Sequence, residues 1–474
     1  MVASLTTNVL NYISMKTRNF LKNKLFKLTP AKTIVFGFIG IILIGAFLLC
    51  LPISHVNKQW YSFVDSLFTS TSAVCVTGLS VIDIAKHFSL FGQIIVMFLI
   101  QIGGLGFVSL TCLVFMLLGK KINYAARMTL QESLNKDNTQ GVVKMVKKII
   151  ITIFSIEFVG FLVLTPSMVA FTGNFWKGCF NALFLSISAF CNAGFDPLGL
   201  KTPELSSLIS LNNNAFVLIP IMLLIVSGGI GFIVLFDIFN FKRKGQKLAF
   251  QTKVVLIVTN ILIVGGALLF AIFEWNNPNT IGEMNVFYKI LNCFFQSITP
   301  RTAGFAAINQ AGLTGTSIAL TNILMIIGGS PMSIAGGIKT TTLFVLLVML
   351  FKQTLNDGSI NVNHKNISSK TINKAIKLLL SAILLLGVSC LLISLFEFDG
   401  VFTFDEILFE CISAISTSGL SLGITPILSI PSKFVLIILM FIGRVGMLTV
   451  PLVFKQNNST ENVIEYIDSK IIVG

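Results

Sequence analysis

Long apolar runs recur along the whole chain, and shorter stretches that mix small, polar and apolar residues separate them. Each long run is sufficient to cross roughly 30 Å of hydrocarbon as a helix. The pattern predicts four units, each made of a first helix, a short mixed segment and a second helix. The first helices are expected at 33–51, 148–170, 253–273 and 375–395, and the second helices at 90–118, 215–240, 318–350 and 434–454.

The mixed segments align with one another, and each places a glycine behind a short polar triplet. They are FVDSLFTSTSAVCVTGLS (63–80), CFNALFLSISAFCNAGFD (179–196), ILNCFFQSITPRTAGFA (290–306, after a one-residue deletion) and FDEILFECISAISTSGLS (404–421). A second signature follows in each second helix: IGGLGF (102–107), SGGIGF (227–232), IGGSPM (327–332) and IGRVGM (442–447). Two marks that recur in the same order indicate an internal fourfold duplication.

This duplication divides the chain into six parts. They are a basic amino-terminal segment (1–32), repeat 1 (33–118), a basic loop with repeat 2 (119–240), a basic loop with repeat 3 (241–350), a basic loop with repeat 4 (351–454) and a carboxyl-terminal tail (455–474). The expected fold is all-α and integral to the membrane, with four helix–pore-loop–helix repeats in pseudo-fourfold symmetry around a central pore.

Composition and charge agree with a multi-pass membrane protein. The 474 residues are 54% hydrophobic and only 11% charged, which is far from the composition of soluble domains. The net charge of +15 lies mainly in segments between the helix pairs. Such segments mark the cytoplasmic side of the cell membrane rather than a nucleic-acid site. Both termini are then cytoplasmic, and each mixed segment must enter and leave the membrane from the outer side.

The recurrence of a glycine in the same place of all four segments predicts a cation filter. Non-helical backbone at membrane depth survives only where it is buried or lines water, and loops that offer carbonyl oxygens can replace the hydration shell of a cation. Glycine as a close-packing residue is the competing interpretation for any single position. The expected potassium-binding filter residues are Val76, Thr77, Gly78, Asn192, Ala193, Gly194, Thr302, Ala303, Gly304, Thr417, Ser418 and Gly419.

These motifs resemble those of the Trk/Ktr/HKT superfamily of potassium transporters, most closely the KtrB type. The resemblance rests on QIGGLGF (101–107), NAGFD (192–196), TPRTAGF (299–305) and GGSPMSIAGGIKTTTL (328–343). It implies a potassium-selective, channel-like uptake pore, a homodimer in the lipid membrane, and a cytoplasmic KtrA-like regulatory ring that binds nucleotide. In related plant proteins a serine at the first filter glycine accompanies sodium transport, so Gly78 favours potassium. Sodium coupling stays open.

The run IIGGSPMSIAGGIKTTT (326–342) breaks the second helix of the third unit, because glycines and a proline lower helix propensity. In the resembling family this segment forms an intramembrane gate, whereas a kink for packing is the alternative. The segment is not a phosphate-binding P-loop, in which a lysine directly follows the last glycine, because Ile338 separates Gly337 from Lys339. The expected gate residues are Gly328, Gly329, Ser330, Pro331, Ser333, Gly336, Gly337, Lys339 and Arg444.

Arg444 replaces the second glycine of the repeated signature and places a guanidinium at membrane depth. Such a charge usually faces a partner or a water-filled cavity, and in the family a matching arginine lies near the gate. We expect Arg444 to contact gate-loop carbonyls, with a structural ion pair as the alternative. Glu157 and Asp237 are expected to act locally near helix ends, and Asp65 and Glu406 either make the outer vestibule negative or cap their helices.

Two other functions compete with a gated uptake pore. A potassium-binding subunit of an ATP-driven pump would share the fourfold plan. A membrane enzyme is disfavoured, because the eight cysteines and three histidines form no metal-ligand or catalytic pattern. We therefore expect no enzyme activity and no cofactor in this chain, with potassium, and sodium if coupling exists, as the transported ions.

Overall fold

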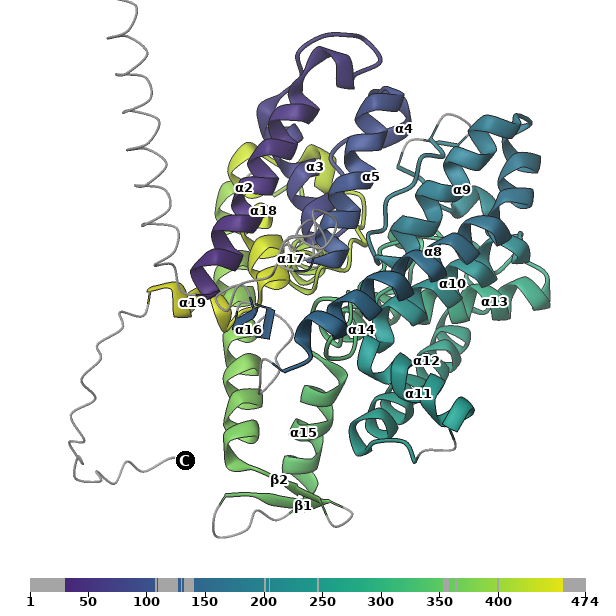
Figure 1. Ribbon diagram of the computed structural model, residues 1–474. Coiled ribbons are helices and arrows are strands. Elements are labelled where there is room, and N and C mark those ends of the chain that lie inside the picture. The colour runs from purple at the N-terminus through teal and green to yellow at the C-terminus, as the bar shows by residue number, and fades with distance from the viewer. Residues whose placement is uncertain are drawn as a thin grey trace, which may run out of the picture.

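The computed structural model describes residues 30–106, 109, 127–128, 130–131, 140–199, 202–203, 205–244, 247–352, 358–362, 365–398 and 400–454. The carboxyl-terminal tail, nearly all of the amino-terminal segment and most of the basic loop that opens repeat 2 lie outside these residues. The described part is built almost wholly of helices, as expected (Figure 1).

The four expected first helices are confirmed, and each extends a few residues beyond at least one expected end. They are α2 (Pro30–Cys50), α8 (Val142–Thr172), α12 (Phe250–Glu274) and α16 (Ser369–Phe396). All four are long and apolar enough to cross a membrane. Large apolar side chains such as Phe47, Phe158 and Leu391 are exposed on them, which suits helices whose outer faces meet lipid rather than water.

Each mixed segment begins with a short helix that ends in a non-helical loop. These helices are α3 (Phe63–Cys75), α9 (Phe175–Phe190), α13 (Val286–Ile298) and α17 (Phe404–Ser416). Polar residues start them: Ser62 accepts the Asp65 N–H, and Thr403 with Glu406 forms a capping box. Glu406 is thus a cap, one of its two expected roles.

The first helix and the short helix of a unit meet through a serine and a glycine. Ser70 donates to Ile42 O over 2.8 Å, and the same contact recurs between the equivalent helices of units two and three. A Cβ atom on Gly45 would lie 2.5 Å from Ser70 Oγ, so only glycine permits this approach. In the fourth unit two buried cysteines, Cys390 and Cys411, lie next to each other at the corresponding place on α16 and α17.

The second helices differ from the expectation, because none of the three that the structure describes past its signature is straight. They run as α10 (Ala215–Ile230) and α11 (Phe232–Lys244), α14 (Gly315–Ile326) and α15 (Thr340–Phe351), and α18 (Ile430–Val445) and α19 (Thr449–Phe454). In the first unit α5 (Leu90–Leu105) ends at the same position. The prediction of a break in the third unit alone was therefore wrong.

The physical reason for these breaks is the fifth position of the signature, which is glycine in the first, second and fourth units. Gly106, Gly231 and Gly446 have φ values of +77°, +98° and +107°, which end a right-handed helix and which glycine adopts without a Cβ clash. The two pieces of the second unit meet at 101°. The third unit has Pro331 at this position, followed by Met332 at φ +55°.

A small sheet at one end of the molecule was not predicted. Strands β1 (Ile360–Val362) and β2 (Lys365–Ile367) pair antiparallel and pack with α15 and α16 around a small apolar cluster (Figure 1). The remaining connections contain short helical turns: η1 (Pro52–Ser54), α4 (Ile84–His87), η2 (Ile209–Leu211), η3 (Gln310–Gly312) and η4 (Thr425–Ile427).

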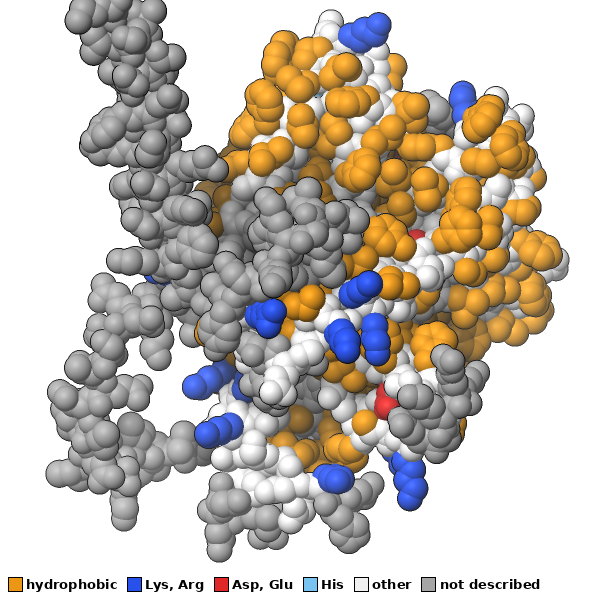
Figure 2. Space-filling model, viewed as in Figure 1, with side chains coloured by type: hydrophobic (Ala, Val, Ile, Leu, Met, Phe, Trp, Pro, Cys, Tyr) orange, Lys and Arg blue, Asp and Glu red, His pale blue; other side chains and the backbone are white. Residues whose placement is uncertain are grey.

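Charge is distributed unevenly over the surface. On the face shown in Figure 2, apolar side chains cover the upper part, and most of the visible Lys and Arg side chains lie in the lower half, toward the end that carries β1 and β2. This pattern matches an apolar belt that ends at a basic membrane interface.

An ion pair joins the first and fourth units. Lys433 Nζ lies 2.9 Å from Asp65 Oδ1, and the two side chains keep 11% and 20% of their exposure. A partly screened pair contributes about 1 kcal/mol or less.

We expect Lys433→Ala to lower the melting temperature of the detergent-solubilised protein by only a few degrees. The exchanged double variant, Asp65→Lys with Lys433→Asp, should recover most of that loss; equal destabilisation in the double variant would contradict a pairwise interaction.

Candidate cation-binding site

The four loops that follow the short helices meet in a closed ring. A Cβ atom on Gly78 would lie 2.6 Å from Ala193 O, and one on Gly194 would lie 2.9 Å from Ala303 O. In turn Gly304 approaches Ser418 O, and Gly419 approaches Thr77 O. Each glycine therefore abuts the loop of the next unit, and the fourth returns to the first.

All four loops share one backbone conformation. The glycines at the ring have φ values of +99°, +69°, +80° and +87° in chain order. Two residues before them, Val76, Asn192, Thr302 and Thr417 have φ values of +55°, +57°, +74° and +53°. Left-handed backbone is a strained state for β-branched residues, and such strain persists at sites where the surroundings impose it. The structure thus brings together all twelve expected filter residues.

A hydroxyl at the carboxyl end of each short helix is hydrogen-bonded to the loop that follows it, in agreement with the expectation that Ser and Thr of these helices bond to local backbone. Gly78 N–H donates to Ser72 Oγ over 3.1 Å, and Gly419 N–H donates to Ser413 Oγ over 3.0 Å. Ser188 accepts from Phe195 N–H, and Thr299 donates to Phe305 O. The sequence carried a signal for this brace, because the aligned segments have Ser, Ser, Thr and Ser at this position.

Three threonine hydroxyls at the ring are buried without a protein partner. The Oγ1 atoms of Thr77, Thr302 and Thr417 form no hydrogen bond with any described residue. Buried hydroxyls normally have a partner, and their exceptions point to an unseen water or ion. A dehydrated cation at the ring would supply one, so the donor set of hydroxyl and main-chain oxygens fits an alkali cation rather than a transition metal.

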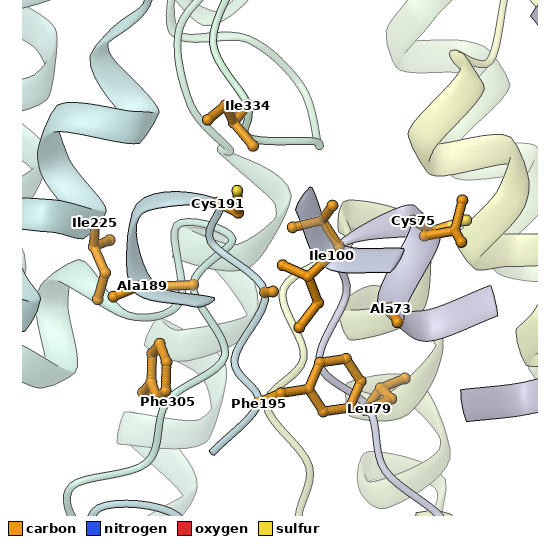
Figure 3. Close-up of a cluster of buried hydrophobic side chains, with 14 of the residues drawn as sticks. Ala73, Cys75, Leu79, Ile100, Ala189, Cys191, Phe195, Ile225, Phe305 and Ile334 are labelled. Carbon is orange, nitrogen blue, oxygen red and sulfur yellow. The ribbon is translucent and has the colours of Figure 1, made fainter. Parts of the chain in front are cut away.

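Apolar side chains support the ring from behind. Each residue that follows a ring glycine is large, apolar and buried: Leu79, Phe195, Phe305 and Leu420. Figure 3 shows three of them, Leu79, Phe195 and Phe305, at one end of an apolar cluster, with Ile334 at the opposite end. The loops therefore rest on packed side chains and not on lipid.

The expected gate segment runs from Ile327 to Lys339 as an irregular loop between α14 and α15. It pairs with the break in the second unit: Ser330 N–H donates to Gly229 O over 2.9 Å, and Phe232 N–H donates to Met332 O over 3.0 Å. Its own ends are joined by the hydrogen bond from Ile338 N–H to Ile326 O, 3.1 Å long. The loop is thus folded and hydrogen-bonded, which a simple proline kink would not produce.

The gate loop also lies directly against the ring. A Cβ atom on Gly336 would lie 2.8 Å from Ser416 O and would meet Thr417 Oγ1. Lys339 Nζ turns back onto the loop and donates to Ala335 O over 2.5 Å. The end of the fourth short helix, the fourth filter loop and the gate loop therefore form one packed unit.

Arg444 holds the gate loop to the first unit. Its guanidinium donates through one nitrogen to Ile334 O and through the other to Gly103 O. The expected contact with a gate-loop carbonyl is confirmed. Its partners among the described residues are main-chain oxygens, so the alternative of a structural ion pair finds no support in these contacts.

Two carboxylates near the ring differ from what the sequence indicated. Glu157 is not at a helix end but in the middle of α8, where 3% of it is exposed; it accepts a hydrogen bond from Gln101 Nε2 over 3.2 Å. Glu410, which the sequence interpretation did not single out, is fully buried on α17. Asp237 acts locally, as expected, since its carboxylate accepts the Ala249 N–H over 2.9 Å.

Comparison with known proteins agrees with this architecture. Residues 10–465 match the TrkH family, described as cation transport proteins. The chain is 37% identical to the "Potassium/sodium uptake protein NtpJ" of Enterococcus hirae, over 94% of this chain and 98% of that protein. It is also 37% identical to the "Ktr system potassium uptake protein B" of Bacillus subtilis, over 95% of this chain and 98% of that protein.

A solved structure shows the same fold. The potassium transporter TrkH from Vibrio parahaemolyticus superposes with a TM-score of 0.66, at 16% identity, over 88% of this chain and 84% of that one. Together with helices long enough to span a bilayer, these matches make the protein a multi-pass membrane protein. The chain belongs to the TrkH family of cation transport proteins.

Proposed function

We propose that this protein takes up potassium through a central pore whose filter is the ring of four loops. The observation that carries the proposal is the closed contact of Gly78, Gly194, Gly304 and Gly419, each against the next loop. Relatives at 37% identity are named as potassium or potassium/sodium uptake proteins, which supports potassium as the main substrate. The name of the first also keeps sodium open as a second ion.

In this proposal the cation is coordinated by oxygens of the twelve filter residues. The main-chain N–H groups of the loops bond back to the short helices, as Thr77 N–H does to Ser72 O over 2.8 Å, so carbonyl oxygens remain for the ion. The carboxyl ends of four short helices converge on the ring, and their dipoles favour a positive charge there. A membrane potential of 100 mV supplies about 2.3 kcal/mol for one monovalent cation, enough to accumulate it roughly fiftyfold.

The gate loop and Arg444 would close the pore on the side of the ring away from the outer entrance. Lys339 lies at the end of this loop, and Arg444 donates a hydrogen bond to it. Two positive charges therefore lie near the ion path. Opening then requires the loop to leave Gly336 and its contact with the fourth filter loop. The basic end of the molecule would face the cytoplasm, with both termini on that side.

Two partners belong to the proposal as well. The printed name "Ktr system" describes its bearer as part of a system, which supports a separate regulatory subunit. We propose that the chain works as a homodimer on a cytoplasmic ring of nucleotide-binding subunits. The cytoplasmic regulatory subunits would open and close the pore by acting on the loop between α14 and α15, because this loop contacts three of the four units.

Substitution of the first ring glycine tests the filter. Gly78 has φ +99°, and a side chain at this position would collide with Ala193 O. Gly78→Ser must therefore displace the neighbouring loop. In cells expressing Gly78→Ser, we expect the selectivity of uptake for rubidium over sodium to fall about tenfold. Gly400→Ser is the control, because Gly400 has φ +66° with open space around its Cβ position. Unchanged ion preference in Gly78→Ser would contradict the filter assignment.

Flux in proteoliposomes separates this function from a pump subunit. Vesicles that contain this chain and no ATP should accumulate rubidium when the membrane potential is negative inside. That potential is imposed by a proton gradient and a protonophore, without valinomycin. Uptake that appears only after addition of an ATPase and ATP would support the pump. A channel-like pore predicts uptake that collapses when the potential is removed.

A further inference from the structure

A buried carboxylate anchors the outer half of the fourth filter loop. Glu410 lies on α17 with none of its surface exposed. It accepts hydrogen bonds from the hydroxyls of Ser421 and Thr425, the latter 3.0 Å long, and from the Leu422 N–H. These three donors follow Gly419 within six residues, so the carboxylate ties the chain that leaves the ring back to the helix that enters it.

The other three units lack a charge at this position. The aligned residues are Thr69, Leu185 and Gln296. Thr69 bonds within its own helix, to Asp65 O over 2.9 Å. Gln296 pairs with Gln310 through two amide hydrogen bonds of 2.8 and 3.0 Å. The third unit therefore has a neutral brace where the fourth has an ionisable one, and the pore carries a built-in asymmetry.

The fourth loop is also held at its inner half. Ser418 Oγ donates to Pro300 O of the third unit over 2.9 Å, and Gly336 of the gate loop abuts Ser416 and Thr417. The inner half is thus fixed by the third unit and by the proposed gate loop, whereas the outer half is fixed by Glu410. The carboxylate can keep the coordinating oxygens in place while the gate side of the loop changes its contacts.

The two oxygens of a carboxyl group suit these donors. A carboxylate only accepts hydrogen bonds and offers two oxygens, which suits two hydroxyls and one main-chain N–H. A glutamine offers one acceptor oxygen and an NH₂ group that cannot serve the Leu422 N–H. Burial of a charge is unfavourable unless it is well paired, so this site needs a compensating role.

We propose that Glu410 is a positioning residue that sets the discrimination of the filter between potassium and sodium. It acts through Ser421, Leu422 and Thr425 on the carbonyl oxygens of the fourth loop. The ion itself is coordinated by the ring, and Glu410 fixes how widely that ring can relax around a smaller cation. This inference rests on the proposed function as a potassium pore.

The test is rubidium uptake in proteoliposomes, with sodium as competitor, for wild type and Glu410→Gln. We expect Glu410→Gln to lose discrimination between the two ions. The KM for rubidium should rise, and inhibition by sodium should strengthen, each by at least fivefold. The maximal rate should stay within about threefold. Thr425→Val, which removes one donor and keeps the carboxylate, should give a smaller change in the same direction.

Asp405→Asn is the matched control, because it removes an exposed negative charge from the first turn of the same helix. Its KM and sodium inhibition should equal those of the wild type. Glu410→Gln with wild-type KM and sodium inhibition would overturn the inference. So would loss of discrimination in Asp405→Asn, which would assign the effect to surface charge. Absence of rubidium uptake in the wild type itself would overturn the proposed function instead.

Discussion

Gly419→Ala is expected to abolish rubidium uptake, leaving less than about a twentieth of the wild-type rate. A Cβ atom at this position would collide with Thr77 O, which belongs to the first unit and closes the ring. Gly419 also has φ +87°, which costs an L-residue of this kind roughly 1–2 kcal/mol even in open space. The fourth loop cannot move outward to relieve the collision, because Glu410 and Leu420 are buried behind it.

Gly423→Ala separates the collision from the backbone effect. Gly423 lies four residues later with φ +99° and has nothing within 4 Å of its Cβ position. We expect this variant to keep at least half of the wild-type uptake, measured at equal amounts of protein in the membrane. Similar losses in both variants would mean that the contact between the fourth and first loops has no special part in conduction.

Arg444→Ala is expected to increase the initial rate of rubidium uptake by about tenfold or more in the absence of any regulatory subunit. The substitution removes the hydrogen bonds that hold Ile334 O of the gate loop to the first unit. It also removes a positive charge near the proposed ion path. Two like unit charges about 8 Å apart repel by about 2 kcal/mol at an effective dielectric constant near 20, which corresponds to about thirtyfold in rate.

Two controls accompany Arg444→Ala. Arg444→Lys keeps the charge but loses the two-pronged contact, so it should show a smaller increase if electrostatic repulsion dominates. Lys253→Ala removes an exposed charge on α12 and should leave the rate unchanged. An Arg444→Ala variant that is present in the membrane at wild-type level yet transports more slowly than the wild type would contradict the role of Arg444 as a closing element.

The sequence predicted the ring because duplication makes the signal redundant. One glycine among many carries little information, but four glycines behind aligned polar triplets define four equivalent loops, which we expected to meet around one axis. The expected gate loop also followed from local chemistry, since Pro331 and its neighbouring glycines cannot continue a helix. Arg444 was found in the same way, as the one charged residue in a column of glycines.

Features that depend on tertiary contacts were not predicted. The breaks at Gly231 and Gly446 look like packing glycines in the sequence, and only the positive φ values reveal the bends. Glu410 is the one charged residue among its aligned counterparts Thr69, Leu185 and Gln296. This is the same kind of signal that singled out Arg444, and the sequence interpretation did not use it. The three donors to Glu410 come from residues 421–425, and the packing of the loop alone brings them to the carboxylate.

Anomalous diffraction from crystals of this protein grown in rubidium or thallium salts tests the central proposition most directly. The account predicts a peak enclosed by the four loops, at coordination distance from oxygens of at least three units that include Thr77, Thr302 and Thr417. Well-ordered loops with no peak between them, and with heavy cations bound only elsewhere on the chain, would contradict it.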